Sequence, residues 1–351
     1  MKTALLDLLA DPATGGPLTL EVGSRNEDGS VAEGSLRAGA GERYLVERSI
    51  PRFVRTDDSG QLQTSTSFGY KWGRQDSYGD AAAIASYRDW LVGKYGFGSA
   101  AEWAGYFNRR RRILDVGCGS GYSSALFLDT AEWRGNAMWI GVDISTAIDV
   151  ARERLGAIPN THFVQADALR MPFAPGSFDT IFSEGVLHHT PSTLAALLAC
   201  SRLLAPGGEF LFYVYRKKAP VREFTDDHVR GVLASMTNDE AWEAMRPLTK
   251  LARDLAALKA TIDVEDIPAL GIKGGRYDVQ RLIYWNFAKL FWNDSYPFEE
   301  NLHVNFDWYR PQYANRQTET EVRAWCAEAG LQIRRFNAEE SGFTVIATKA
   351  P

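Results

Sequence analysis

Short apolar runs alternate with segments of helical spacing through the middle of the chain. Four of the runs end at or beside an acidic residue, and a fifth follows a Pro-Gly-Gly turn. Near-continuous apolar runs are typical of strands buried on both faces of a parallel sheet. Such strands alternating with helices predict a doubly wound α/β sheet. The expected strands lie at 112–116, 138–143, 162–167, 177–184 and within 203–214, with helices at 122–128 and 146–155.

Flanking segments add further elements on both sides of this alternation. Helical spacing predicts helices at about 80–92 and 99–108 before the first strand, and another at 319–329 near the end. Two apolar runs at 331–336 and 343–348 then read as strands. The predicted sheet therefore receives its last two strands from the end of the chain.

A glycine-rich turn follows the first strand directly. Gly117, Gly119 and Gly121 alternate along it, and a helix begins at once, so the backbone amides of the turn lie at a helix N-terminus. Alone this G-x-G-x-G pattern is weak evidence for a ligand. The second strand, however, ends in Asp143, twenty-two positions after Gly121. A carboxylate there is placed to accept hydrogen bonds from both hydroxyls of a ribose.

Four ordered motifs extend this pattern to a family resemblance. The motifs LDVGCGSG (114–121), GVDIS (141–145), FVQADALRMPFAPGSFDTIFSEGVLHHTPS (163–192) and LLAPGGEFLFYV (203–214) resemble the class I S-adenosylmethionine-dependent methyltransferases. The competing interpretation is a dinucleotide-binding dehydrogenase. The spacing G-x-G-x-G in place of G-x-G-x-x-G and the Pro-Gly-Gly turn before the fifth strand disfavour it.

The resemblance implies a fold and a division of the chain. The fold is an α/β, Rossmann-like, seven-stranded doubly wound sheet with a helical, aromatic-rich insertion and a small N-terminal extension. The two last strands would form the antiparallel hairpin that ends the sheet in this family. The expected segments are an extension at 1–56, a helical linker or lid at 57–111, a cofactor-binding core at 112–215, the insertion at 216–318 and the closing helix and hairpin at 319–351.

S-adenosylmethionine is the cofactor that the resemblance implies, and its position on the motifs assigns residues to it. Asp143 would hold the ribose hydroxyls, Asp167 and Ala168 would lie beside the adenine, and Asp115 would reach the amine. Trp72 would attract the sulfonium by a cation–π contact, or else pin the N-terminal segment to the sheet. The expected cofactor-binding residues are Asp115, Gly117, Gly119, Gly121, Asp143, Ile144, Asp167, Ala168, Ser183 and Trp72.

His188, Glu184 and Tyr70 are the candidate catalytic residues. His188 follows the fourth strand, where an imidazole would take a proton from a nucleophilic oxygen or nitrogen. The alternative is that His188 and His189 only hold the loop, since the surrounding sequence is ordinary for the family. Methyl transfer also needs no strong base where alignment is good. Both interpretations stay open at this stage.

The first 56 residues resemble the small zinc ribbon that precedes some methyltransferase domains. The four ligand positions of that pattern would fall near Asp11, Thr14, Arg37 and Ala40, and none of them is a cysteine. Without thiolates a tetrahedral zinc site is not expected, and the segment is interpreted as a metal-free remnant used for packing or partner contact. The expectation for the whole chain is no bound metal.

The insertion is unusually aromatic in its later part. Residues 281–325 contain twelve aromatic residues in 45, about twice the chain average of 12%. An aromatic lid would make a dry pocket for a small molecule. The alternative is that most of these rings form the core of the insertion. The residues chosen to contact substrate are Tyr284, Asn305, Trp308 and Tyr309, with Asp307 beside them.

Composition favours a soluble enzyme of the cytoplasm. The 351 residues carry a net charge of −5, and the one basic run is 109–112, so a nucleic-acid partner is not expected. Three scattered cysteines fit a reducing compartment, and no apolar span or signal peptide indicates a membrane. The sequence leaves the oligomeric state open.

These observations predict a methyltransferase that acts on a small metabolite or natural-product intermediate by in-line transfer. Two alternatives remain. In a lyase or cyclase on the same fold, the amine of S-adenosylmethionine would attack its own γ-carbon and release methylthioadenosine. In a non-catalytic binding module, the N-terminal remnant would engage a partner protein.

Overall fold

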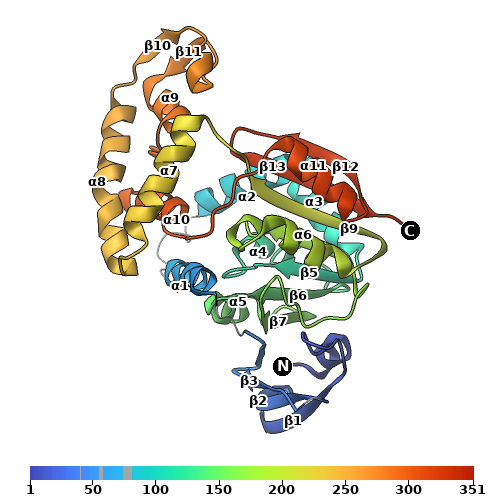
Figure 1. Ribbon diagram of the computed structural model, residues 1–351. Helices are drawn as coiled ribbons and strands as arrows, with labels where there is room; N and C mark the ends of the chain where they lie inside the picture. Colours follow the sequence, from blue (N-terminus) through green and yellow to red (C-terminus); the bar gives the residue numbers. More distant parts are fainter. Residues whose placement is uncertain (40, 55–57, 74–80) are drawn as a thin grey trace.

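One mixed sheet organises the molecule (Figure 1). The computed structural model describes residues 1–39, 41–54, 58–73 and 81–351, and for residues 71–73 and 81–83 it describes the backbone alone. Seven neighbouring strands of the sheet have the order β7-β6-β5-β8-β9-β13-β12. Their bounds are β5 (Arg112–Val116), β6 (Met138–Asp143), β7 (Thr161–Gln165), β8 (Phe178–Glu184), β9 (Leu204–Tyr215), β12 (Leu331–Ala338) and β13 (Gly342–Lys349).

The strand directions confirm the doubly wound α/β fold. Strands β5 to β9 pair in parallel, whereas β13 pairs antiparallel with both β9 and β12. The C-terminal hairpin therefore ends the sheet as the resemblance implies. Parallel neighbours place all their carboxyl ends at one edge, which is where ligands bind in open α/β sheets.

Alternation along each strand supplies two separate cores, one on each face of the sheet. Ile113 packs with the helices of one face, whereas Leu114 and Val116 pack with those of the other. Buried strands need apolar residues at both parities, which explains the continuous apolar runs in the sequence. The first face is covered by α2 (Ala81–Tyr95), α3 (Ala100–Asn108), α4 (Tyr122–Leu128) and α5 (Ala147–Leu155), and the second by α6 (Thr193–Arg202) and α11 (Glu319–Glu328).

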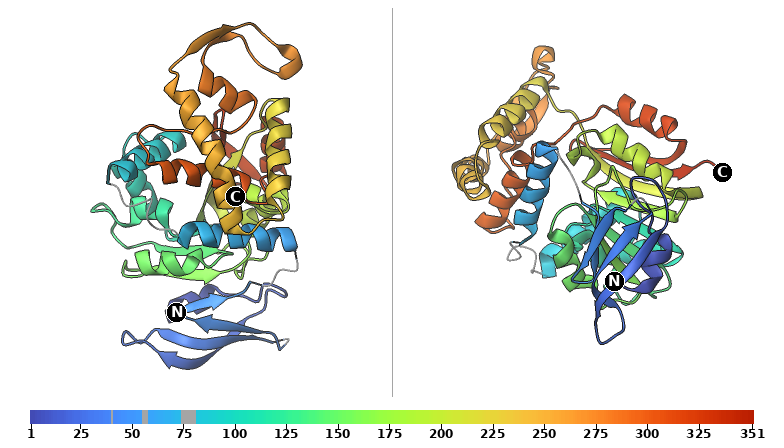
Figure 2. Two further views of the ribbon diagram at one scale, coloured as in Figure 1. Left: turned by 90° about the vertical axis from the view of Figure 1, so that its left-hand side faces the viewer. Right: turned by 60° about the horizontal axis from the view of Figure 1, so that its bottom comes forward.

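The sheet contains eleven strands where seven were expected, because the N-terminal segment continues it (Figures 1 and 2). An antiparallel meander reaches β7 through its last strand, where the Phe53 amide donates to the Gln165 carbonyl at 2.7 Å. Arg52 also forms two hydrogen bonds to the Asp149 carboxylate of α5, at 2.8 and 3.0 Å. The meander comprises β1 (Leu18–Arg25), β2 (Val31–Ala38), β3 (Arg43–Glu47) and β4 (Ile50–Arg52), preceded by a 3₁₀ helix at Thr3–Leu8.

A buried carboxylate holds the turn at the start of this meander. Asp11 is 2% exposed and accepts hydrogen bonds from the Thr14 hydroxyl at 2.6 Å and the Tyr44 hydroxyl at 2.7 Å. Burial alone would raise the pKa of Asp11, but these hydrogen bonds outweigh it and lower the pKa below its usual value. Of the other positions compared with zinc ligands, Arg37 forms an ion pair with Glu21, and Ala40 lies outside the described residues.

Helix α1 (Ser59–Gly73) was not predicted, because its glycines and hydroxyl residues give a weak helical pattern. Its glycines are explained by close packing. A Cβ at Gly69 would lie 2.9 Å from the Thr146 hydroxyl at the start of α5, and one at Gly60 would lie 2.9 Å from the Tyr313 ring. Tertiary contacts, not intrinsic propensity, therefore favour the helix.

The insertion forms a separate helical layer beside the carboxyl edge of the sheet (Figure 2). This layer has its own hydrophobic core, the third of the molecule, which is made by α7, α8 and α10 and contains the buried residues Trp242, Phe306 and Tyr309. A two-stranded hairpin, β10 with β11, projects from this layer and was not predicted. The elements of the insertion are α7 (Pro220–Leu233), α8 (Asn238–Ala257), β10 (Thr261–Val264), a 3₁₀ turn at Pro268–Leu270, β11 (Gly275–Asp278), α9 (Val279–Asn286) and α10 (Phe298–Tyr309). A further 3₁₀ turn at Leu187–His189 follows β8 in the core.

Within the described ranges, none of the helices combines the length and apolar character that crossing a lipid bilayer requires.

Replacing Asp11 tests the role of the N-terminal turn. The Asp11→Ala variant removes two side-chain hydrogen bonds and leaves the buried Tyr44 hydroxyl without its acceptor. We expect the free energy of unfolding to fall by about 2 kcal/mol, measured by urea denaturation. Asp7→Ala, at an exposed acid of the same segment, serves as the control and should leave stability unchanged. Equal stability of both variants would contradict the assignment.

Candidate active site

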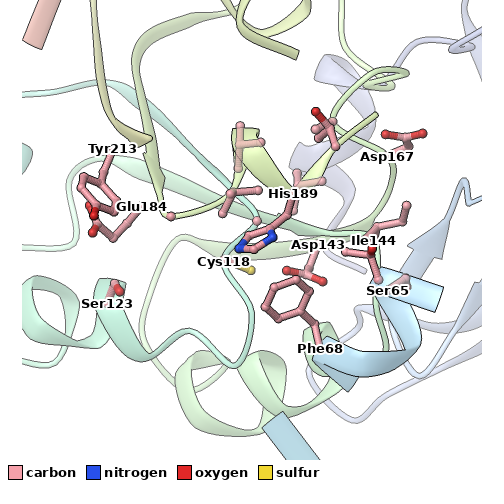
Figure 3. A pocket seen from close by; sticks show the side chains of 18 of the residues that line it. Ser65, Phe68, Cys118, Ser123, Asp143, Ile144, Asp167, Glu184, His189 and Tyr213 are labelled. Atoms are coloured by element: carbon pink, nitrogen blue, oxygen red, sulfur yellow. The ribbon is translucent and has the colours of Figure 1, made fainter. Parts of the chain in front are cut away.

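A cavity of about 310 Å³ opens at the carboxyl ends of β5, β6, β7, β8 and β9 (Figure 3). Helices α1, α2, α4 and α10 and the segments after β7 and β8 contribute the rest of its wall. A volume of this size is at the lower end for small-molecule sites. The lining residues include Gln61, Thr64, Ser65, Phe68, Tyr87, Gly117, Cys118, Tyr122, Ser123, Asp143, Ile144, Asp167, Ala168, Met171, Glu184, Val186, His189, Tyr213, Tyr215 and Asp307.

The three glycines of the turn after β5 have different roles. Gly117 lines the cavity with φ of 71°, and a Cβ there would lie 2.3 Å from Val186. Gly119 does not line the cavity, but its amide donates to Asp143 at 2.9 Å. Gly121 faces α5, where a Cβ would lie 2.6 Å from Leu155. Only the first glycine therefore gives a ligand direct access to the backbone.

Asp143 lies in the middle of the cavity wall (Figure 3). Its Oδ2 accepts from the Gly119 amide at 2.9 Å, and its Oδ1 accepts from the amide and hydroxyl of Ser145 at 2.8 and 2.6 Å. Burial raises the pKa of Asp143, and these three donors oppose the rise. Each carboxylate oxygen has two lone-pair directions, so capacity remains for a further donor from a ligand.

Asp167 marks one end of the cavity, together with Ile144 and Ser65 (Figure 3). Its Oδ1 accepts from the Leu169 amide at 2.9 Å, and it is 7% exposed. Ala168 lines the same end. Apolar side chains beside one carboxylate suit a flat ring that carries an amino group.

Glu184 marks the opposite end, beside Tyr213 (Figure 3). The Lys94 ammonium of α2 forms an ion pair with one of its oxygens, and the Tyr95 hydroxyl donates to the other at 2.7 Å. Both partners precede the strands of the core, and no local pattern in the sequence indicated them. Glu184, expected as a catalytic residue, therefore lines the cavity with both oxygens already hydrogen-bonded.

Asp115 and Ser183 lie outside the cavity lining. Asp115 accepts from the Ser124 hydroxyl of α4 at 2.6 Å, and burial raises its pKa to about 7. The Ser183 hydroxyl donates to the Val116 carbonyl at 3.1 Å and is fully buried. Both side chains therefore join the strands to their neighbours. The side chain of Trp72 lies outside the described residues.

The two histidines after β8 differ in position. His189 lines the cavity, and its Nδ1 lies 2.6 Å from the Tyr313 carbonyl, which can only accept. His188 is fully buried behind the wall, stacked on Tyr215 with ring centroids 3.6 Å apart. Neither ring nitrogen of His188 has a hydrogen-bond partner among the residues that the structure describes, and burial lowers its pKa well below 6.5. The third catalytic candidate, Tyr70, lies outside the cavity lining and donates its hydroxyl to Asp239.

None of the four substrate candidates of the insertion lines the cavity: Asn305, Trp308 and Tyr309 are buried in its interior, and Tyr284 is half-buried. Trp308 donates its Nε1 to Asp226 at 2.9 Å, and the Tyr309 hydroxyl accepts from the Lys289 amide at 2.9 Å. Asn305 accepts from the Phe291 amide at 2.8 Å, and the Tyr284 ring packs edge-on against Trp285. Of the twelve aromatic residues at 281–325, Phe306, Trp308 and Tyr309 are buried in the core of the insertion and the others are half-buried.

Several cavity residues were missed by sequence reasoning. Tyr213 and Tyr215 at the end of β9 were not predicted, whereas Asp307, named beside the substrate candidates, does line the cavity although its neighbour Trp308 does not. The aromatic and glycine pattern of 67–73 did indicate a segment beside a ligand, and Phe68 of that segment lines the cavity. No comparable signal marks Tyr87.

The cavity residues fit S-adenosylmethionine, the cofactor that the sequence motifs imply. The carboxylates of Asp143, Asp167, Glu184 and Asp307 line the cavity, and across the described ranges no Lys or Arg does. An acidic lining suits a ligand that carries a sulfonium and an ammonium. Gly117 presents only backbone to the cavity, and a Cβ there would clash with the Val186 side chain.

Comparison with known sequences identifies a protein family that matches the region around this cavity. A family described as "Methyltransferase domain" matches residues 114–212. The chain is 36% identical over 123 residues to an uncharacterized protein of Synechococcus sp., and 35% identical over 103 residues to a malonyl-[acyl-carrier protein] O-methyltransferase of Legionella pneumophila. These matches cover 33% and 29% of this chain, and they span only 29% and 35% of the relatives' own length. A ubiquinone biosynthesis O-methyltransferase of Ralstonia nicotianae is 27% identical over 233 residues, which is 63% of this chain and 88% of that protein.

Solved structures resemble the chain remotely. A magnesium protoporphyrin IX methyltransferase of Synechocystis has 15% identity and a TM-score of 0.42, covering 84% of this chain and 100% of its own. A 1,6-didemethyltoxoflavin-N1-methyltransferase of Burkholderia thailandensis has 13% identity and a TM-score of 0.40, covering 88% and 96%. The family match and the strand order lead to the same assignment, and the remote structural likenesses are not needed for it. Residues 114–212 are a methyltransferase domain of the class I, S-adenosylmethionine-dependent type that the sequence motifs indicate.

Proposed function

We propose that this protein transfers a methyl group from S-adenosylmethionine to a small molecule. The observation that carries the proposal is one cavity that runs from Asp167, past Asp143, to Glu184 and Tyr213 at the carboxyl edge of a methyltransferase domain. Bound S-adenosylmethionine would supply a methyl group activated by its sulfonium. The protein's own contribution is to hold the two reactants in line and to exclude water.

In this proposal each cofactor-binding residue contacts the part of S-adenosylmethionine that lies at its position along the cavity. Asp143 accepts from the ribose hydroxyls, because its carboxylate is fixed by three donors and one lone-pair direction of Oδ2 stays open. Asp167, Ile144 and Ala168 contact the adenine, and Gly117 allows the chain to pass close to the amino-acid part. Ser183, Asp115 and Gly121 support these elements from behind, and Gly119 acts through Asp143.

The acceptor molecule contacts the aromatic part of the lining, which includes Phe68, His189, Tyr213 and Tyr215, and Asp307 lines the same cavity. A lining of rings with few polar groups suits a small, largely apolar acceptor. Relatives named for ubiquinone biosynthesis and for a malonyl-carrier substrate are compatible with such an acceptor. Because no cation from the described ranges lines the cavity, a nucleic-acid acceptor is disfavoured.

The segments around the methyltransferase domain act as the cover of this site. Helices α1 and α2 of the expected linker at 57–111 contribute Phe68 and Tyr87, and α10 of the insertion contributes Asp307. The extension at 1–56 and the closing segment at 319–351 complete the sheet at its two edges. Acceptor specificity would therefore lie mostly in residues 57–111 and 216–318.

His189, not His188, is the histidine placed to act on the acceptor. Since the Tyr313 carbonyl only accepts, a neutral His189 holds its proton on Nδ1 and its lone pair on Nε2. His188 is enclosed behind Tyr215 and stays neutral, so its role is to support that ring.

Product analysis tests the proposed activity. Purified protein is incubated with S-adenosylmethionine and a panel of small phenols, quinols, amines and carboxylic acids, and products are followed by mass spectrometry. We expect S-adenosylhomocysteine in equal amount to a methylated acceptor. Methylthioadenosine formed without any acceptor would contradict methyl transfer and would establish a lyase. Failure to bind S-adenosylmethionine at millimolar concentration would remove both activities.

Replacing Asp143 tests the cofactor assignment. The Asp143→Asn variant keeps the side-chain volume but replaces one acceptor oxygen by a donor, so it cannot receive both ribose hydroxyls. We expect the dissociation constant of S-adenosylmethionine to rise roughly 10- to 100-fold, measured by titration calorimetry. Asp129→Asn, at an exposed acid, is the control. An unchanged constant in a folded Asp143→Asn variant would refute the assignment.

His188 should make the free energy of unfolding depend on pH. Its pKa is far below 6.5 in the folded chain and near 6.5 in the unfolded chain, so the unfolded chain binds more protons as the pH falls below that value. Folded stability is therefore full above pH 6.5 and declines by about 1.4 kcal/mol per pH unit beneath it. His188→Gln should remove this part of the decline in denaturation between pH 5 and 6.5.

The exposed His228 supplies the matched control for that measurement. His228→Gln should leave the dependence of stability on pH as it is in the unmodified protein. An unaltered decline in His188→Gln would show that His188 is charged in the folded protein.

A further inference from the structure

A buried ion pair stands at the Glu184 end of the cavity. The side chains of Lys94 and Glu184 are only 1% and 9% exposed. The Lys94 ammonium binds one carboxylate oxygen, and the Tyr95 hydroxyl donates to the other at 2.7 Å. Glu184 lines the cavity, whereas Lys94 and Tyr95 stand behind it. The wall thus presents a carboxylate whose counter-ion is hidden from a ligand.

Lys94 is enclosed by aromatic rings on its other sides. Its Nζ lies 3.6 Å from the centroid of the Tyr213 ring and 4.2 Å from that of Trp90. Glu184 is its one carboxylate ion-pair partner in the described ranges, and Glu339 acts on it from a greater distance. Burial lowers the pKa of Lys94, and the Glu184 charge opposes that shift. Each member of the pair therefore depends on the other for its charge.

The pair joins the methyltransferase domain to a helix outside it. Glu184 ends β8 within residues 114–212, whereas Lys94 and Tyr95 end α2, which packs against β12 and β13. The Lys94 carbonyl also accepts from Asn337 of β12 at 3.4 Å. The closing hairpin of the sheet therefore contacts the Lys94 backbone, while the carboxylate holds the ammonium.

We propose that Lys94 and Tyr95 are positioning residues that keep Glu184 ionised and oriented at the cavity wall, so that it offers a hydrogen-bond acceptor to a cationic or hydroxyl group of the ligand. The proposal rests on the proposed function for the identity of that ligand. A carboxylate without its counter-ion in this enclosed place would instead take up a proton.

Other titratable groups surround Glu184 and must be common to every variant compared. They come from four elements packed against Glu184. Since the groups that two variants share act alike in both, the ratio of the affinities of the two variants at each pH cancels the effect of these groups on ligand binding. These groups are Tyr87 and Tyr95 of α2, Asp115 of β5, Tyr213 of β9 and Glu339 of the β12–β13 turn.

The test compares S-adenosylmethionine affinity in Lys94→Met with that in the unmodified protein between pH 5 and 7.5, by titration calorimetry. Below pH 7.5 the ligand's own amino group stays mostly charged. At low pH the lone Glu184 takes up a proton and loses part of its acceptor capacity, so the variant should bind the ligand more weakly than the unmodified protein. As the pH rises, Glu184 ionises without a counter-ion, and the variant should bind the cationic ligand more tightly, by on the order of tenfold.

Two controls separate positioning from general damage. The double variant Lys94→Met with Glu184→Gln cannot titrate at this place, so its affinity ratio should be independent of pH. Tyr95→Phe keeps the ion pair and should also give a flat ratio. If Lys94→Met does not fold, Glu184→Gln replaces it: the unpaired ammonium then titrates, and affinity should again rise with pH relative to the unmodified protein.

A pH-independent affinity ratio in the single variant would overturn the proposal for Lys94 while leaving the proposed function intact. Failure of the unmodified protein to bind S-adenosylmethionine at any pH would instead contradict the proposed function itself. The two failures are therefore distinguishable in one set of titrations.

Discussion

The carboxyl edge of the parallel sheet carries buried acidic residues, and each of them needs hydrogen-bond donors. The rest of the site depends on which donors each carboxylate has. Asp115 has one hydroxyl partner, and burial raises its pKa to about 7. Asp143 has three neutral donors and faces the cavity. Glu184 has an ammonium and a phenol. Since burying a carboxylate without partners is costly, the choice of partner decides which acid supports the fold and which is available to a ligand.

Much of the fold followed from periodicity, because buried strands, glycine turns and helix spacing are local signals. The seven strands of the core formed where apolar runs stood. Two features had no local signal. Helix α1 depends on close packing at Gly69 against α5, and the N-terminal meander joins the sheet through contacts between Phe53 and Gln165, over a hundred positions apart in sequence. Both are decided by tertiary contacts that no window of sequence contains.

For the candidate site, too, the sequence predicted the positions that depend on local signals and not those that depend on tertiary packing. Positions at the strand ends, such as Asp143 and Asp167, line the cavity because parallel strands end together. Asp115 does not, since side chains alternate along a strand and its parity turns it toward α4, where Ser124 lies. Asp307 could not be separated from Trp308 by sequence, because adjacent residues of a helix point about 100° apart and only the packing of α10 decides which one reaches the cavity.

The aromatic richness of the insertion has a structural cause that composition alone does not reveal. A small helical layer has little interior volume, and large rings such as Trp242, Phe306 and Tyr309 fill it with few residues. Their polar atoms then need buried partners, which Asp226 supplies to Trp308. The cofactor residues Gly117, Asp143 and Asp167 belong to one continuous domain, whereas α1, α2 and α10 add side chains to the cavity wall from outside it. On the proposed function, the acceptor can therefore change through these three helices without disturbing the residues that hold the cofactor.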